Sequence, residues 1–153
     1  MAKSMKAAKE LDSSFLNYQP DYNIDDLPKE FDELKVVQFS DFHAGSLDDI
    51  EAVKLGLETI QNLAPDLILF TGDLVNNTSD EFDKFIPYLK ALSAPLGKFA
   101  ILGNHDYGLY YKWESDEAKA QNEQRIRNHH DSIGFDLLEN QNRTIEKNGA
   151  KIN

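Results

Sequence analysis

Three short runs of apolar and aromatic residues, each followed at once by polar side chains, constrain the fold of this chain most strongly. The runs cover residues 36–39, 67–70 and 99–102. Runs of this length that stop at turn residues are typical of buried strands. Because the runs do not alternate apolar with polar positions, they predict a parallel or largely parallel sheet with both faces covered.

The segment between the first two runs has helical spacing. Its apolar positions recur at intervals of three and four residues, and they are Ile50, Val53, Leu57 and Ile60. This spacing predicts one apolar stripe of a helix. Ser46 or Asp48 is the expected N-cap, and Pro65 is expected to end the helix. The charges of Asp48 and Asp49 favour a helix N-terminus there.

A second helix is predicted between the second and third runs. Thr78 and Glu81 have the spacing of a capping box, and Pro87 is expected to kink the helix or shorten its first turn. The expected inner face consists of Phe82, Phe85, Ile86 and Leu89. Strand, helix, strand, helix, strand is the βαβ pattern of an α/β fold.

The chain as a whole divides into two parts at residue 34. Residues 1–33 are predicted to form a polar leader with a short helix and an extended lead-in, and residues 34–153 to form one domain. Within that domain we expect a solvent-facing polar helix over 115–131, a strand near 135–138, and a hairpin turning at Asn148-Gly149 in a type I′ turn. The return strand of this hairpin stops after three residues, so we expect the domain to be truncated at its C-terminus.

Charge and cysteine content narrow the chemistry. The chain carries 27 acidic and 16 basic residues, a net charge of −11, which disfavours a surface for nucleic acid. It contains no cysteine, so any metal ion must be held by oxygen and imidazole ligands.

Polar side chains gather where each apolar run ends. They are Asp41 and His43 after the first run, Asp73 after the second, and Asn104, His105 and Asp106 after the third. The carboxyl ends of parallel strands meet at one edge of a sheet, where ligands bind. If residues 41–43 stay extended, Asp41 and His43 point to the same side. Asp, His and Asn suit Mn, Fe, Zn or Mg, and two ions about 3.5–4 Å apart would use them all.

Each of these clusters also has an ordinary structural explanation. Gly-Asp is a frequent turn dipeptide, and Gly-Asn-His-Asp can form Asx-type hydrogen bonds. Three such clusters after three successive buried strands need a common partner, because buried polar groups must be satisfied. A metal site would satisfy all three together.

The three blocks together resemble a known family. Ser40-Asp41-Phe42-His43-Ala44-Gly45, Thr71-Gly72-Asp73-Leu74-Val75 and Gly103-Asn104-His105-Asp106 are similar to the D-x-H, G-D and G-N-H-D blocks of the calcineurin-like metallophosphoesterases. The resemblance covers roughly residues 34–153. It implies the first half of an αββα sandwich. Within the family it points to bacterial single-domain phosphoesterases that often follow membrane helices, so it implies possible membrane association of a full-length protein; the compartment stays open.

The resemblance also implies a role for each residue. Asp41 and His43 would bind one divalent ion, Asp73 would bridge to a second, and Asn104 would bind that second ion. His105 would stabilise or protonate the leaving group, and Asp106 would orient His105. The implied reaction is hydrolysis of a phosphomonoester, phosphodiester or pyrophosphate by a metal-bridging hydroxide.

The chain departs from the family pattern after the third block. It lacks the G-H-x-H block that supplies later ligands, and the adjacent His129 and His130 are interpreted as solvated surface residues. This absence keeps open a non-catalytic metal-binding or interaction domain of the same fold, and an isolated chain without activity. Two further sets of residues have two interpretations each. The aromatic side chains after the third block either form a substrate wall or cap, or pack the loop against the core; they are Tyr107, Tyr110, Tyr111 and Trp113. Asn76 and Asn77 either line the site near Asp73 or cap the next helix.

Overall fold

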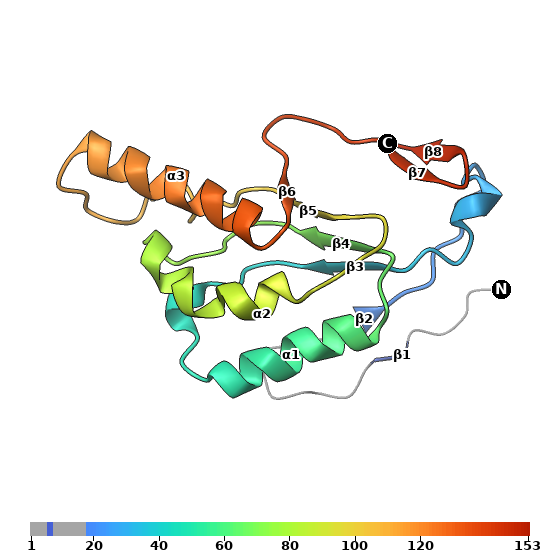
Figure 1. The fold of residues 1–153 in the computed structure, drawn as a ribbon, viewed down its shortest axis with the longest axis horizontal. Coiled ribbons are helices and arrows are strands. Elements are labelled where there is room, and N and C mark those ends of the chain that lie inside the picture. Colours follow the sequence, from blue (N-terminus) through green and yellow to red (C-terminus); the bar gives the residue numbers. More distant parts are fainter. Residues whose placement is uncertain (1–5, 8–17) are drawn as a thin grey trace.

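The core of the fold is a four-stranded parallel sheet. A computed structural model describes residues 6–7 and 18–153, and its main sheet has the order β3-β4-β5-β6 (Figure 1). The strands are β3 (Val36–Phe39), β4 (Leu67–Phe70), β5 (Lys98–Ala100) and β6 (Asp136–Leu137). Every neighbouring pair is parallel. The α/β class and all four strands are therefore confirmed, although β5 ends two residues earlier than predicted.

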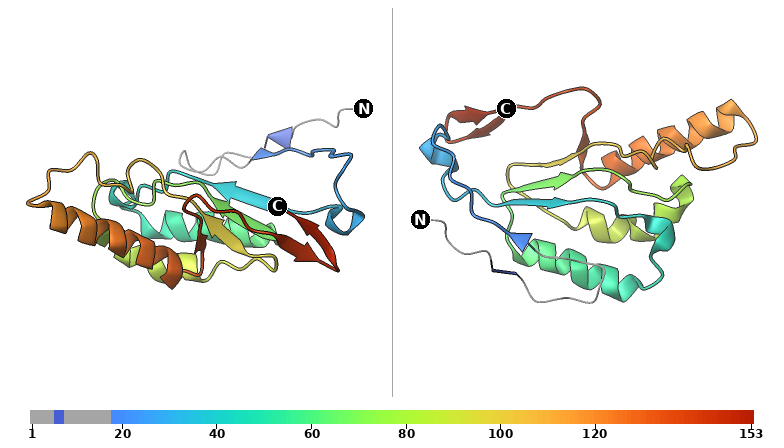
Figure 2. Two further views of the ribbon diagram at one scale, coloured as in Figure 1. Left: turned by 90° about the horizontal axis from the view of Figure 1, so that it is seen from above. Right: turned by 180° about the vertical axis from the view of Figure 1, so that it is seen from behind.

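The three α-helices cover one face of this sheet. They are α1 (Ile50–Asn62), α2 (Ile86–Lys90) and α3 (Asp116–Ser132), and the two further views show them on the same side of the strands (Figure 2). Right-handed crossovers between strands added in one direction place every helix on one face. The expectation that all three predicted strands are buried on both faces is wrong for two of them. In β3, exposed Val36 and Gln38 alternate with half-buried Val37 and Phe39. In the third run, Ile101 is 44% exposed.

Helix α1 begins later than either predicted N-cap. Its N-cap is Asp49, whose side chain accepts a hydrogen bond from the amide of Ala52 at 3.0 Å. Ser46 instead ends the 3-10 turn η2 (Ala44–Ser46), which delays the helix. The helix ends at Asn62, before Pro65, as predicted.

The second predicted helix is divided in two. The 3-10 helix η3 (Ser79–Phe85) leads directly into α2, and Pro87 lies in the first turn of α2, where its missing N–H costs nothing. The capping box of Thr78 and Glu81 is present. Phe82, Phe85 and Leu89 are fully buried, so the predicted inner face is correct apart from the change of helix type.

The prediction of a solvated surface for His129 and His130 is wrong. Both are buried, at 5% and 0% exposed. The ring of His129 lies against Phe82 of η3, whereas the ring of His130 lies against Phe70 of β4. Adjacent residues on a helix point in different directions, but α3 has a separate partner on each side. Because most residues of α3 are polar, its sequence did not predict that these two histidines are buried.

Short elements surround this core. They are β1 (Lys6–Ala7) paired with β2 (Tyr18–Gln19), η1 (Lys29–Phe31), and the hairpin of β7 (Ile145–Lys147) and β8 (Ala150–Ile152). Asn148 and Gly149 have φ values of 51° and 85°, as the predicted type I′ turn requires. The predicted leader helix lies mostly outside the described residues, and the domain boundary at residue 34 stays a prediction. No helix in the described part of the chain is both long and apolar enough to cross a membrane.

Candidate metal centre

The loops that follow β3, β4 and β5 are joined to one another at the carboxyl edge of the sheet. The amide of Asp41 donates to the carbonyl of Gly72 at 2.9 Å, and the amide of His43 donates to the carbonyl of Asp73 at 3.0 Å. The amide of His105 in turn donates to Oδ1 of Asp73 at 2.8 Å. These bonds extend the pairing of the strands into their loops and bring the polar side chains together.

His43 lies between two carboxylates. Its Nε2 is 3.8 Å from Oδ1 of Asp41 and 3.9 Å from Oδ2 of Asp73. The predicted extended geometry of residues 41–43 is wrong, because Asp41 and His43 have φ values of 56° and 44°, both left-handed. The side chains converge through this bent backbone. Such strained conformations cluster at binding and catalytic sites.

His105 completes a group with the donor set of a metal site. One potential ligand atom each from His43, Asp73 and His105 lies within 4.8 Å of the others. The rings of His43 and His105 meet edge to face at 4.7 Å between centroids. Asp41 and Asp73 both face His43, and carboxylates so arranged repel each other unless a cation lies between them. The side chains present therefore fit a divalent cation.

Asp106 lies beneath this group and holds the loops. It is 1% exposed, and its carboxylate accepts from four backbone amides: Asp73 at 3.0 Å, Leu74 at 2.8 Å, Val75 at 3.4 Å and Gly103 at 2.9 Å. Burial raises the pKa of Asp106, although the amide hydrogen bonds oppose that rise. The implied role of orienting His105 needs correction, because both carboxylate oxygens serve the backbone of the neighbouring loops.

The ring of His105 is oriented by Asn76. Nδ1 of His105 lies 2.7 Å from the carbonyl oxygen of Asn76. A carbonyl only accepts, so Nδ1 carries the proton and Nε2 is left to accept or release one. Glu81 fixes the Asn76 segment, since its carboxylate accepts from the amides of residues 76, 77 and 78. The capping-box pattern singled out Glu81 in the sequence. The role of the Asn76 carbonyl could not be predicted, because every residue has a backbone carbonyl.

Asn104 lies on the exposed side of the same loop. Its Nδ2 donates to the hydroxyl of Tyr110 at 2.9 Å. Tyr107, Tyr110 and Tyr111 are 40%, 62% and 49% exposed, so they do not pack against the core. Trp113 anchors this loop on itself, since its Nε1 donates to the carbonyl of Gly108 at 2.8 Å.

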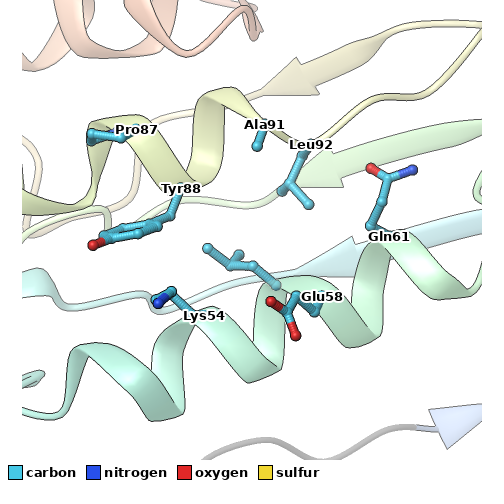
Figure 3. Close-up of a pocket in the computed structure, with 8 residues that line it drawn as sticks. Lys54, Glu58, Gln61, Pro87, Tyr88, Ala91 and Leu92 are labelled. Carbon is cyan, nitrogen blue, oxygen red and sulfur yellow. The ribbon is translucent and has the colours of Figure 1, made fainter.

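A shallow groove elsewhere on the molecule does not belong to this centre. It has a volume of about 210 Å³ and lies between α1 and α2 (Figure 3). Its lining residues are Lys54, Leu57, Glu58, Gln61, Pro87, Tyr88, Ala91 and Leu92. None of the six residues predicted for the site is among them.

The three loops and their donors agree with a match to a known family. The profile of the calcineurin-like phosphoesterases matches residues 34–151. The chain belongs to this family. The metallophosphoesterase resemblance is therefore confirmed, and so is the α/β fold class with its parallel sheet.

Several bacterial relatives share the same region. An uncharacterized metallophosphoesterase of Bacillus subtilis, YkuE, is 45% identical over 86 residues, which make up 55% of this chain and 30% of that protein. The UDP-2,3-diacylglucosamine pyrophosphatase LpxG of Chlamydia muridarum is 40% identical over 88 residues, 55% of this chain and 27% of that protein. An uncharacterized metallophosphoesterase of Aquifex aeolicus is 34% identical over 109 residues, 70% of this chain and 41% of that protein. The chain thus matches less than half the length of each relative.

Proposed function

We propose that this chain supplies the first metal ligands and the proton donor of an enzyme that hydrolyses a phosphate ester with two divalent metal ions. The observation that carries the proposal is the convergence of Asp41, His43, Asp73 and His105 after three adjacent parallel strands. Membership in the calcineurin-like phosphoesterases supports the same reaction class.

Each residue has a distinct task in this proposal. Asp41 and His43 would hold one ion, Asp73 would lie between both ions, and Asn104 would offer Oδ1 to the second ion. When bound, the two ions would polarise the phosphoryl oxygens and lower the pKa of an attacking water. Mn, Fe, Zn and Mg are all compatible with these oxygen and imidazole donors.

His105 would move the proton. Its Nδ1–H is engaged by the carbonyl of Asn76, so proton exchange with the leaving-group oxygen would occur at Nε2. The segment of residues 76–78 cannot rotate freely, because three of its amides are bound to Glu81. Asp106 would act at one remove by fixing the amide of Asp73 and hence the position of the bridging carboxylate.

The scissile bond would belong to a phosphomonoester, a phosphodiester or a pyrophosphate. The name of the Chlamydia relative is that of an enzyme acting on a nucleotide-linked pyrophosphate, so this bond belongs in the first substrate panel. The net charge of −11 disfavours a nucleic-acid backbone as the substrate. Membrane association of a longer protein stays a prediction.

The decisive test compares three proteins with added Mn²⁺: this chain, a version extended to the length of its relatives, and the extended version with Asp73→Ala. Each would be assayed on an aryl phosphomonoester, an aryl phosphodiester and a nucleotide-linked pyrophosphate. Asp73→Ala should lower the rate by at least about 100-fold, because loss of even an outer contact of a metal ligand costs 10- to 100-fold. Asp48→Ala, an exposed carboxylate near the same loop, is the matched control and should keep full activity.

The outcomes separate this proposal from the alternative domain. Metal-dependent turnover that needs Asp73 supports the enzyme. Mn²⁺ binding that needs Asp73, without turnover of any substrate by the extended protein, would favour a non-catalytic metal-binding domain. An extended protein that binds no metal and hydrolyses nothing would refute both.

A further inference from the structure

We propose that Tyr110 is a positioning residue of this centre, which fixes the amide of Asn104 and the ring of His105 at the same time. The inference rests on the proposed function, because it assigns Tyr110 a task only through those two residues. The chain segment between residues 105 and 110 brings the tyrosine back over the loop that contains both of them.

The first contact holds the amide of Asn104 by its nitrogen. Nδ2 of Asn104 donates to the hydroxyl oxygen of Tyr110 at 2.9 Å. An amide nitrogen is a poor metal ligand, whereas the amide oxygen is a good one. By engaging Nδ2, the tyrosine leaves Oδ1 as the free end of the side chain. This hydrogen bond holds the exposed amide of Asn104 in the orientation that leaves Oδ1 free.

The second contact restrains His105. The ring of Tyr110 lies 4.6 Å from the ring of His105, with an interplanar angle of 38°. Nδ1 of His105 is already bound to the carbonyl of Asn76. A hydrogen bond at one nitrogen still allows the ring to swing about its bonds, and a ring packed on its face limits that motion. Tyr110 and the Asn76 carbonyl therefore restrain the ring of His105 together.

The loop that carries Tyr110 is itself well held. The amide of Gly108 donates to the carbonyl of His105 at 3.0 Å, and Nε1 of Trp113 donates to the carbonyl of Gly108 at 2.8 Å. Tyr110 nevertheless remains 62% exposed. The anchoring of the loop by Trp113 means that the tyrosine is not needed for packing, so its replacement should leave the fold intact.

The experiment compares Tyr110→Phe, Tyr110→Leu and the control Tyr111→Phe, all in the extended protein. The control removes a hydroxyl from a neighbouring exposed tyrosine that packs on Trp113. Mn²⁺ affinity would be measured by calorimetry, and kcat and KM would be measured on a phosphoester that the unaltered protein hydrolyses. Thermal unfolding would verify that the variants are folded.

Tyr110→Phe should weaken Mn²⁺ binding at one site and lower kcat, each by about five-fold, the scale of one lost hydrogen bond, with KM unchanged. Tyr110→Leu should lower kcat further than Tyr110→Phe does, because the ring contact with His105 is lost as well. Tyr111→Phe should match the unaltered protein. A purely structural role would lower the unfolding temperature without changing Mn²⁺ affinity, and that result would overturn the proposal.

The readouts distinguish this inference from the proposed function. If the unaltered protein hydrolyses a substrate and Tyr110→Phe matches it in Mn²⁺ affinity and kcat, the role of Tyr110 is refuted and the proposed enzyme function is retained. Mn²⁺ affinity that depends on Tyr110, without any turnover, would refute the enzyme and retain the positioning role. An unaltered protein that neither binds Mn²⁺ nor turns over would refute both.

Discussion

Asp73 and Asp106 are joined through each other's loops: the amide of Asp73 donates to the carboxylate of Asp106 at 3.0 Å, while the carboxylate of Asp73 accepts from the amide of His105 at 2.8 Å. His105 precedes Asp106 in the chain, so the loops after β4 and β5 bind one another in both directions. The position of the proposed bridging carboxylate therefore depends on a buried residue whose own carboxylate binds backbone amides.

Replacement of Asp106 by Asn should destabilise the protein and weaken metal binding together. Each carboxylate oxygen accepts from two amides, so an NH₂ group in place of either oxygen leaves two buried donors without an acceptor. At about 1–3 kcal/mol for each such donor, we expect a loss of about 2–6 kcal/mol in the free energy of unfolding. Urea denaturation with a Mn²⁺ titration would measure both effects. An unchanged midpoint would show that Asp106 does not hold these loops.

Replacement of Gly103 by Ala should displace Asp73. A Cβ at Gly103 would lie 2.2 Å from Oδ1 of Asp73 and 2.4 Å from its amide nitrogen, and the backbone cannot move aside cheaply. We expect Mn²⁺ affinity to fall by at least about ten-fold, because ligand position controls binding. Gly149→Asn is the control, since a Cβ there meets nothing within 4 Å and Asn tolerates positive φ. Equal affinity of both variants would contradict this prediction.

Acid should destabilise the fold through His130. Burial lowers the pKa of His130 from 6.5 to about 4, and neither ring nitrogen has a hydrogen-bond partner among the described residues. Between these two values the unfolded chain binds a proton that the folded chain does not, so stability must fall as the pH falls from 6.5 to about 4. The expected loss is about 2–3 kcal/mol over this range. Burial lowers the pKa of His129 in the same direction.

The test is urea denaturation at about pH 7 and about pH 4.5, on either side of most of this titration. His130→Leu, which fills a similar apolar space, should reduce the difference between the two conditions. His105→Gln, at a half-buried histidine outside α3, is the control and should retain most of it. If His130→Leu kept the full acid sensitivity, other groups would be responsible.

Replacement of Lys98 by Met should loosen two helix ends. Nζ of Lys98 donates to the carbonyl of Leu92 at 2.8 Å, just after α2, and to the carbonyl of Ile133 at 2.6 Å, at the end of α3. Burial lowers the pKa of this ammonium, which shows that its site is partly shielded from water. Methionine keeps the stem but donates nothing, so we expect a loss of about 1–3 kcal/mol in thermal unfolding. Lys54→Met removes an exposed pair with Glu51 and a contact with the ring of Tyr88, and it should cost less than Lys98→Met.

The local sequence was sufficient for the elements and for the edge where the site lies. The runs at 36–39 and 67–70 predicted strands of the same bounds, and Asn148-Gly149 predicted the hairpin turn. These features depend on side-chain periodicity and on backbone preferences within a few residues. The three polar blocks were informative for the same reason, because each directly follows its strand.

Only the tertiary structure decided how the residues of the site divide their tasks. Asp106 binds backbone amides of the loop at 73–75, His105 binds a carbonyl 29 residues away, and His130 is buried against Phe70. Each of these contacts joins segments that are distant in the chain, and two of them involve backbone groups that every residue possesses. Sequence patterns record periodicity and residue type, so they determined which side chains reach the edge of the sheet. Which atom each side chain binds there was determined by the packing of the three loops and α3 against one another.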